Sequence, residues 1–132
     1  MVKINMTNLE KIMSMLDWNM PSYIQSQGRI LSNNVESIVP FIQPLDQKYN
    51  KNVWENCAII ISERNDLELK PHLTELMEWL QDMNWPGAFC IFDRLKKYQD
   101  EKSFQAAIKL CFKKAKKIND KVWQENLNAL TK

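Results

Sequence analysis

Apolar residues recur at helical intervals along almost the whole chain, and this periodicity restricts the fold more than any other feature. No segment alternates apolar and polar residues in the way that a half-buried strand requires. The pattern divides into eight helices and no sheet. The fifth helix carries leucines at i, i+4, i+7 and i+11, which places them on one stripe that must be buried. These leucines are Leu69, Leu73, Leu76 and Leu80. The sequence therefore predicts an all-α fold.

The seventh helix is amphipathic along its whole length. Its apolar residues share one face, and four lysines share the opposite face. The apolar residues are Phe104, Ile108, Cys111, Ala115 and Ile118, and the lysines are Lys102, Lys109, Lys113 and Lys116. We expect the first face to be buried and the second to face solvent.

Capping residues and prolines mark the ends of the helices. Thr7 with Glu10, and Asn52 with Glu55, have the spacing of a capping box. Three prolines suit the first turn of a helix; they are Pro21, Pro40 and Pro71. Pro44 follows the second of these too closely for one regular helix. The third helix therefore either begins at Pro44 or is kinked there.

The chain resembles itself when it is shifted by 31 residues. The aligned pairs are Pro40 with Pro71, Ile42 with Leu73, Leu45 with Leu76, Trp54 with Trp85 and Ile60 with Ile91. The frame Asp-x-Asn-x-Pro occurs at residues 17–21 and again at 82–86, and residues 119–123 resemble 50–54. Four of the five tryptophans, Trp18, Trp54, Trp85 and Trp123, recur every 31 to 38 residues, near the periods of tetratricopeptide and HEAT arrays. We predict a stack of about four antiparallel helical hairpins, a HEAT-like α-α superhelix; an irregular helical bundle is the alternative.

Composition fits one folded domain, which we assign to residues 1–132. The chain of 132 residues is 45% hydrophobic and 26% charged. Two glycines cannot build the phosphate-binding loops of nucleotide enzymes. One histidine and three separated cysteines lack the spacing of a zinc site, and an odd number of scattered cysteines is typical of a reducing compartment. We expect no cofactor and no metal.

The chain shows no segment for export or membrane insertion. The residues near its N-terminus include no apolar stretch of signal-peptide length. The longest apolar run, residues 57–61, is far too short to cross a bilayer. We therefore expect a cytoplasmic protein that does not bind membranes.

Charge is distributed unevenly along the chain although its net value is only +2. Up to Asp93 there are 7 basic and 12 acidic residues, whereas the remainder holds 11 basic and 4 acidic residues. Such an asymmetry determines which partners a surface attracts rather than which fold forms. The C-terminal third is predicted to present a cationic surface.

Two motifs between Tyr49 and Lys97 carry a family resemblance. One is Trp54-Glu55-Asn56-Cys57-Ala58, and the longer one runs from Glu78 to Ala88 with the sequence EWLQDMNWPGA. The chain resembles the bacterial domain of unknown function 5071 family, small HEAT-like helical proteins, most strongly over this stretch. The resemblance implies a fold and a bacterial setting, and it carries over no catalytic residue. By analogy of fold, an immunity-type or other binding role is a hypothesis.

An acidic surface beside a tryptophan is the first candidate binding site. Glu75, Glu78 and Asp82 share the face of the fifth helix opposite the leucine stripe, with Trp79 at its edge. A large aromatic residue framed by charge is typical of interface hot spots. Trp79 is, however, only about 60° around the helix from Leu76, so it can also pack inward above a solvated acidic face. Both interpretations remain open.

The lysines of the seventh helix are the second candidate. Lys109, Lys113 and Lys116 form the core of the densest charge cluster, broad enough to bind an acidic protein, a second copy of the chain or a phosphate backbone. Only three arginines occur in the chain, and no aromatic residues are interleaved with these lysines, which disfavours nucleic acid. A plain solvated face is the fourth interpretation.

The remaining histidine, cysteine and carboxylate side chains do not form a recognisable catalytic site. His72 follows Pro71 and receives no role; Cys57 lies on an apolar face, and Cys90, near Arg94, is the better candidate for redox reactivity. Carboxylates on a convex helix have no cleft in which to act as acid and base. The sequence therefore predicts a non-enzymatic protein-interaction module that uses its charged faces, and the alternative is a nucleic-acid-binding protein that uses the lysines.

Overall fold

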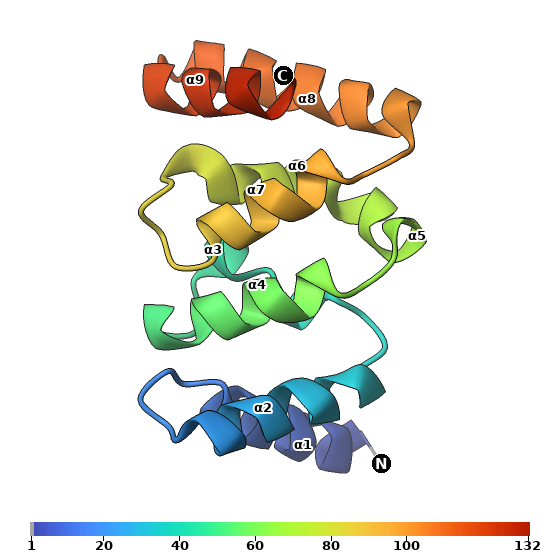
Figure 1. The fold of residues 1–132 in the computed structure, drawn as a ribbon, viewed down its shortest axis with the longest axis vertical. Coiled ribbons are helices and arrows are strands. Elements are labelled where there is room, and N and C mark those ends of the chain that lie inside the picture. Colours follow the sequence, from blue (N-terminus) through green and yellow to red (C-terminus); the bar gives the residue numbers. More distant parts are fainter. Residues whose placement is uncertain (1) are drawn as a thin grey trace.

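The computed structural model describes residues 2–132, with the side chains of residues 8–45 and 47–132 (Figure 1). Every regular element in this range is a helix, so the fold is all-α, as the sequence predicted. The α-helices are α1 (Val2–Met15), α2 (Ser22–Leu31), α3 (Gln43–Asp46), α4 (Trp54–Ser62), α5 (Asp66–Leu69), α6 (Leu73–Glu78), α7 (Ala88–Lys96), α8 (Glu101–Lys117) and α9 (Lys121–Leu130). Short 3₁₀ helices join them: η1 (Ser32–Asn34), η2 (Val39–Phe41), η3 (Lys51–Val53), η4 (Lys70–His72) and η5 (Trp79–Gln81).

The helices lie in two layers (Figure 1). In one layer α2, α4, α7 and α9 are successive neighbours, and in the other α3, α6 and α8 are neighbours. α1 packs against α2 at one end of the molecule, and α8 packs against α9 at the other. Because the chain progresses from one end to the other, the two termini lie at opposite ends.

The predicted leucine stripe is buried, although the helix that carries it is broken. All four leucines from Leu69 to Leu80 are in the core. The predicted fifth helix is instead a succession of α5, η4, α6 and η5. Pro71 lies in the first turn of η4, where it offers no N–H to an α-helical ladder. The prediction of one continuous helix was therefore wrong, whereas the predicted face was right.

Pro44 begins the third helix. It occupies one of the first two positions of α3, where the missing N–H is tolerated. Pro40 has the same place in η2. α3 ends after four residues at Gln47, which has a φ of 52° in the left-handed region. Of the two alternatives, the structure favours a start at Pro44, because α3 begins beside it and η2 is a separate short helix.

The Asp-x-Asn-x-Pro turns are equivalent in structure. The Asp17 carboxylate accepts a hydrogen bond from the N–H of Asn19 at 2.8 Å, and Asp82 accepts one from the N–H of Asn84 at 2.8 Å. Each aspartate also accepts a turn hydrogen bond at its own carbonyl from the residue three positions later. This part of the predicted internal similarity is confirmed.

The predicted capping boxes were wrong. α1 begins at Val2, five residues before Thr7. At the other predicted box, the capping side chain is that of Asn50, which accepts from the N–H of Asn52 at 2.9 Å. An extra turn of 3₁₀ helix precedes α4, so the cap lies two residues earlier than the spacing indicated.

α8 has the amphipathic character that the sequence predicted, with one exception. Its lysine positions are exposed, and Phe104, Ile108, Cys111 and Ala115 are buried. Ile118 is 56% exposed, contrary to prediction. The helix ends at Lys117, and Asn119 has a φ of 58°, so Ile118 leaves the helical stripe.

Each of the three arginines joins segments of the molecule that are far apart in sequence. Arg29 donates to the Asn56 side chain at 2.6 Å. Arg64 donates to two backbone carbonyls in the segment after α2, at 2.8 and 3.0 Å. Arg94 donates to the Asp66 carboxylate at 2.6 Å and to the carbonyl of Arg64 at 2.9 Å. These guanidinium groups therefore hold successive tiers together.

Candidate functional site

The acidic candidate residues already have partners within the protein. Glu75 lies 2.9 Å from Nδ1 of His72, and Glu78 lies 3.2 Å from Nζ of Lys114. Asp82 accepts the turn hydrogen bond described above. The side chains of Glu75 and Glu78 are only about a quarter exposed, because α8 packs against α6. The predicted acidic docking surface is therefore largely used to join α6 to its own turn and to α8.

Trp79 is fully buried, so it cannot serve as a surface anchor. Its indole N–H donates to the carbonyl of Pro86 at 3.0 Å. Its ring packs edge-on against Trp54, with centroids 6.0 Å apart. The outward interpretation of Trp79 was wrong because the turn that follows η5 folds back and supplies the acceptor, and α4 supplies the apolar ring of Trp54.

The two motifs that carry the family resemblance pack against each other. The Glu55 carboxylate accepts the N–H of Gly87 at 3.0 Å, and Trp54 meets Trp85 edge-on with centroids 5.6 Å apart. Gly87 has a φ of 87°, and a Cβ there would lie 2.7 Å from Cβ of Ala58. The motifs thus form one structural contact between α4 and the turn before α7, which we call the tryptophan joint. Its residues are Trp54, Glu55, Ala58, Trp79, Trp85, Pro86 and Gly87.

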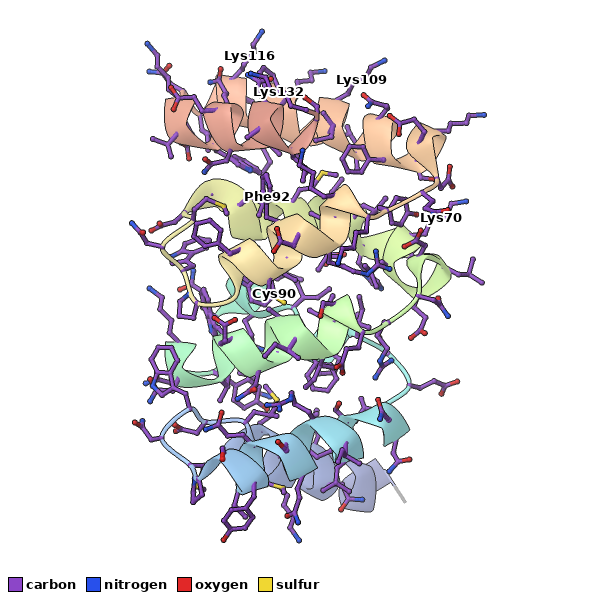
Figure 2. All side chains as sticks on the ribbon, viewed as in Figure 1. Lys70, Cys90, Phe92, Lys109, Lys116 and Lys132 are labelled. Carbon is purple, nitrogen blue, oxygen red and sulfur yellow. The ribbon has the colours of Figure 1, made fainter. Side chains whose placement is uncertain are left out.

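The lysine candidates are all in solvent. Figure 2 shows Lys109 and Lys116 at the α8–α9 end of the molecule, pointing away from the other tiers. Lys113 is also exposed, and Nζ of Lys116 lies 5.5 Å from the centroid of the Phe112 ring. Leu110, which lies between Lys109 and Lys113 in the sequence, is 62% exposed. We define the lysine face as Lys102, Lys109, Lys113 and Lys116.

Little in the protein neutralises the lysine face. Of the lysines of α8 that the structure describes, Lys114 alone forms an ion pair, and it lies beside the face rather than in it. The helix is held at its start by Asp100, whose carboxylate accepts from the N–H and the hydroxyl of Ser103 at 3.3 and 2.7 Å. These hydrogen bonds lower the pKa of Asp100. The lysine face therefore lies on a helix about 25 Å long whose N-terminus is capped by Asp100.

A shallow cleft of about 490 Å³ lies between the end of α4 and α7. Asp66 and Arg94 line it and are paired with each other at 2.6 Å. Burial opposes ionisation of Asp66, but hydrogen bonds from the Gln99 N–H and from Arg94 outweigh it and lower the pKa of this carboxyl. The cleft's charged centre is therefore occupied by a structural ion pair.

The thiols are not activated. Burial raises the pKa of Cys57, and it raises the pKa of Cys111 to about 11. Cys90 lies between α4 and α7 (Figure 2); burial raises its pKa, and a hydrogen bond with Ser62 only partly opposes this. The thiol, not the nucleophilic thiolate, therefore dominates at neutral pH at all three positions. The candidate redox role of Cys90 receives no support from its surroundings.

Two absences complete the description of residues 2–132. No group of three or more His, Cys, Asp or Glu side chains in the described part of the chain is arranged to hold a metal ion. None of the described helices has the length and the apolar character that a membrane span requires.

One surface was not predicted from the sequence. Five large apolar side chains are at least 40% exposed along α2 and the turn before it, and we call them the α2 face: Trp18, Met20, Tyr23, Ile30 and Leu31. The signal that could have revealed it is a run without a charged residue from 18 to 28.

Comparison with known proteins identifies a family and nothing further. The family model described as Domain of unknown function (DUF5071) matches residues 55–131, more than half of the chain. The match runs from Glu55 through α9, beyond the stretch from Tyr49 to Lys97 that carries the resemblance in sequence, and residues before Glu55 lie outside it. The comparisons with curated proteins and with solved structures gave no match. The chain belongs to the DUF5071 family, a domain of unknown function.

Proposed function

We propose that this protein is a non-enzymatic protein-interaction module whose lysine face docks an acidic protein. The observation that carries the proposal is the set of exposed cations on α8, set at one end of the molecule where no other tier covers them. Cations on a pre-ordered helix attract an acidic surface before contact and fix its orientation on arrival. Leu110, exposed beside them, offers an apolar contact within the same surface.

The structure favours a protein partner over nucleic acid. Arginine is the preferred residue for bidentate phosphate contacts, and all three arginines are engaged within the protein, as described above. Phe112 is partly buried against the core, and Nζ of Lys116 lies over its ring, so it is not free for base stacking. Lysines alone support salt-dependent attraction without base contacts.

The candidate reaction groups of the described residues are engaged in structural contacts, which supports a non-enzymatic role. Glu78 and Asp82, the carboxylates that could act as acid and base, are held by Lys114 and by a turn N–H. The cleft between α4 and α7 contains a paired Asp66 and a protonated Cys90. Neither arrangement leaves a group poised to transfer a proton or attack a substrate.

We also infer a HEAT-like scaffold in a bacterial cytoplasm. Two helical layers, equivalent aspartate turns and arginines that tie successive tiers support the comparison with HEAT arrays. Free cysteines fit a reducing compartment. An immunity-type role is one form of the proposed function, in which the captured acidic protein is a toxin.

Capture of proteins from the native lysate tests the proposal. The test variant carries Lys109→Glu, Lys113→Glu and Lys116→Glu, and a matched control carries Lys11→Glu, Lys96→Glu and Lys97→Glu, which changes the net charge equally. We expect wild type and control to retain the same acidic proteins after nuclease treatment, and the test variant to lose them.

Two results would contradict this function. If the test variant retains the same proteins as the control, the lysine face is a solvated surface. If nuclease treatment abolishes capture, and a duplex or single-stranded oligonucleotide restores a salt-dependent anisotropy signal, the partner is nucleic acid. The acidic residues supply a further comparison, since replacing Glu75 and Asp82 by Lys is expected to leave capture unchanged.

A further inference from the structure

The α2 face gathers five of the exposed large apolar side chains of the described residues, and it lies at the opposite end of the molecule from the lysine face. Tyr23 is 66% exposed and Ile30 is 65% exposed. Tyr23, Gln27 and Ile30 have the spacing i, i+4 and i+7, so their side chains share one side of α2. Tyrosine, tryptophan and methionine are the residues enriched at protein interfaces, and all three occur here.

Helix α2 itself contributes no charged side chain to this face. The only ionisable side chain in α2 that is charged at neutral pH belongs to Arg29, and it points into the molecule toward Asn56. Gly28 holds α2 close to α1, since a Cβ there would lie 2.9 Å from Cβ of Met15. The face is therefore neutral, largely apolar and carried by a firmly seated helix.

Its position is at the end of the helical stack. Within its layer α2 has α4 on one side, and on its other side the described residues form no further helix (Figure 1). Terminal units of stacked-helix proteins normally present a polar outer face for solubility. At the α8–α9 end lysines surround the exposed Leu110, whereas α2 leaves Tyr23 and Ile30 in water without a charged side chain of its own on that face.

We propose that a second copy of this chain covers the α2 face, forming a two-fold dimer joined end to end. In a two-fold contact the same patch meets itself, so each charge would face its own copy. The lysine face cannot satisfy this condition, because its cations would repel. The α2 face satisfies it, because Tyr23, Gln27 and Ile30 of one copy would meet uncharged side chains of the other.

The dimer does not depend on the proposed function, but it would extend it. Joined through α2, two copies carry their lysine faces at the two distant ends of the assembly. One dimer would then hold two acidic partners, or two sites of one partner, and gain avidity without new contacts. As in any reversible association, the fraction of dimer is expected to rise with protein concentration.

Sedimentation velocity of the full chain over a wide concentration range tests the dimer. Wild type is expected to pass from monomer to dimer and no further. Tyr23→Glu with Ile30→Glu is expected to weaken dimerisation by about tenfold or more, since four carboxylates would meet across the contact. A matched control, Leu67→Glu with Val122→Glu, alters residues that are 79% and 58% exposed elsewhere and should dimerise as wild type does.

The altered side chains are in solvent, so circular dichroism should show that each variant folds. Three results would overturn the dimer. Wild type could remain monomeric at every concentration, or the Tyr23→Glu, Ile30→Glu variant could dimerise unchanged. An open series of oligomers that dissolves in salt would show head-to-tail pairing of opposite charges instead. The test leaves the lysine face intact, so it is independent of the capture experiment.

Discussion

The two ends of this molecule are built from the same kind of helical pair and present opposite surfaces. At one end, α2 exposes Tyr23 and Ile30 and no charge. At the other end, α8 exposes lysines around Leu110. Both pairs bury an apolar stripe against the next tier, so the demand for a core does not explain the difference. The outward faces of α2 and α8 are not constrained by the core, so the difference between them points to binding rather than to folding.

The family match divides the molecule along the same line. It covers α8 and α9 completely and begins at Glu55, so α1 and α2 lie outside it. The tryptophan joint lies close to this boundary and connects α4 to the turn before α7. The comparison therefore separates a family-matched part that ends in cations from an N-terminal part that ends in apolar groups.

The largest effect is expected at Gly87, within the tryptophan joint. Gly87→Ala places a side chain at a φ of 87°, with its Cβ 2.7 Å from Ala58 and 3.0 Å from the carbonyl of Trp54. Strain and overlap together should lower the free energy of unfolding by about 3 kcal/mol or more in urea titrations.

Gly28→Ala is the matched substitution in the N-terminal part. Gly28 lies within α2, where alanine has a helix propensity about 1 kcal/mol more favourable than glycine. This gain only partly offsets the steric overlap of the new Cβ with Met15. We expect a net loss of about 1 kcal/mol. Equal losses at the two glycines would show that the joint is not the more constrained contact.

Trp79→Phe is expected to have the next largest effect. It removes the indole N–H that satisfies the carbonyl of Pro86 and part of the buried ring that contacts Trp54. We expect a loss of about 2 kcal/mol, measured by thermal and urea unfolding. Trp18→Phe in the exposed turn before α2 should change stability by less than about 0.5 kcal/mol. A comparable loss at both positions would contradict the burial of Trp79.

Acid should weaken the tie between α5 and α7. The pKa of Asp66 is lowered in the folded protein, so its ionised form adds stability at pH values above its unfolded pKa. That contribution is lost as the pH falls through the lower, folded pKa. The stability difference between wild type and Asp66→Asn should therefore be present at neutral pH and shrink in acid. A difference that grows toward low pH would contradict the assignment.

The smallest effects on stability are expected at the two ends. Each substitution of the lysine face, and each of Tyr23 and Ile30, should change the free energy of unfolding by less than about 0.5 kcal/mol, because these side chains are in solvent. Thermal unfolding at low protein concentration measures this. A loss of several kcal/mol would show that the end faces serve the fold rather than binding.

Faces of helices could be predicted from the sequence, because burial repeats with the helical period. The leucines from Leu69 to Leu80 and the lysines of α8 are where that period places them. The break at Pro71 was not predicted, because the buried stripe continues through α5, η4, α6 and η5 although the hydrogen-bond ladder does not.

Contacts between distant residues could not be predicted. Glu78 meets Lys114, and Trp79 meets Pro86 and Trp54, through tertiary packing that no local pattern encodes. The acidic candidate surface was lost for that reason. The α2 face was not predicted because the candidate surfaces were chosen by their charged residues, and residues 18–28 contain none.

Salt titration of one sample by sedimentation velocity tests the contrast between the two ends most directly. With an acidic protein captured by the lysine face present, rising salt should release that partner, because exposed charges are screened. The two-fold contact through α2 should persist, because apolar contacts are not weakened by salt. The account predicts dimers that lose their partners as salt increases. Partners that remain bound while dimers dissociate would contradict it.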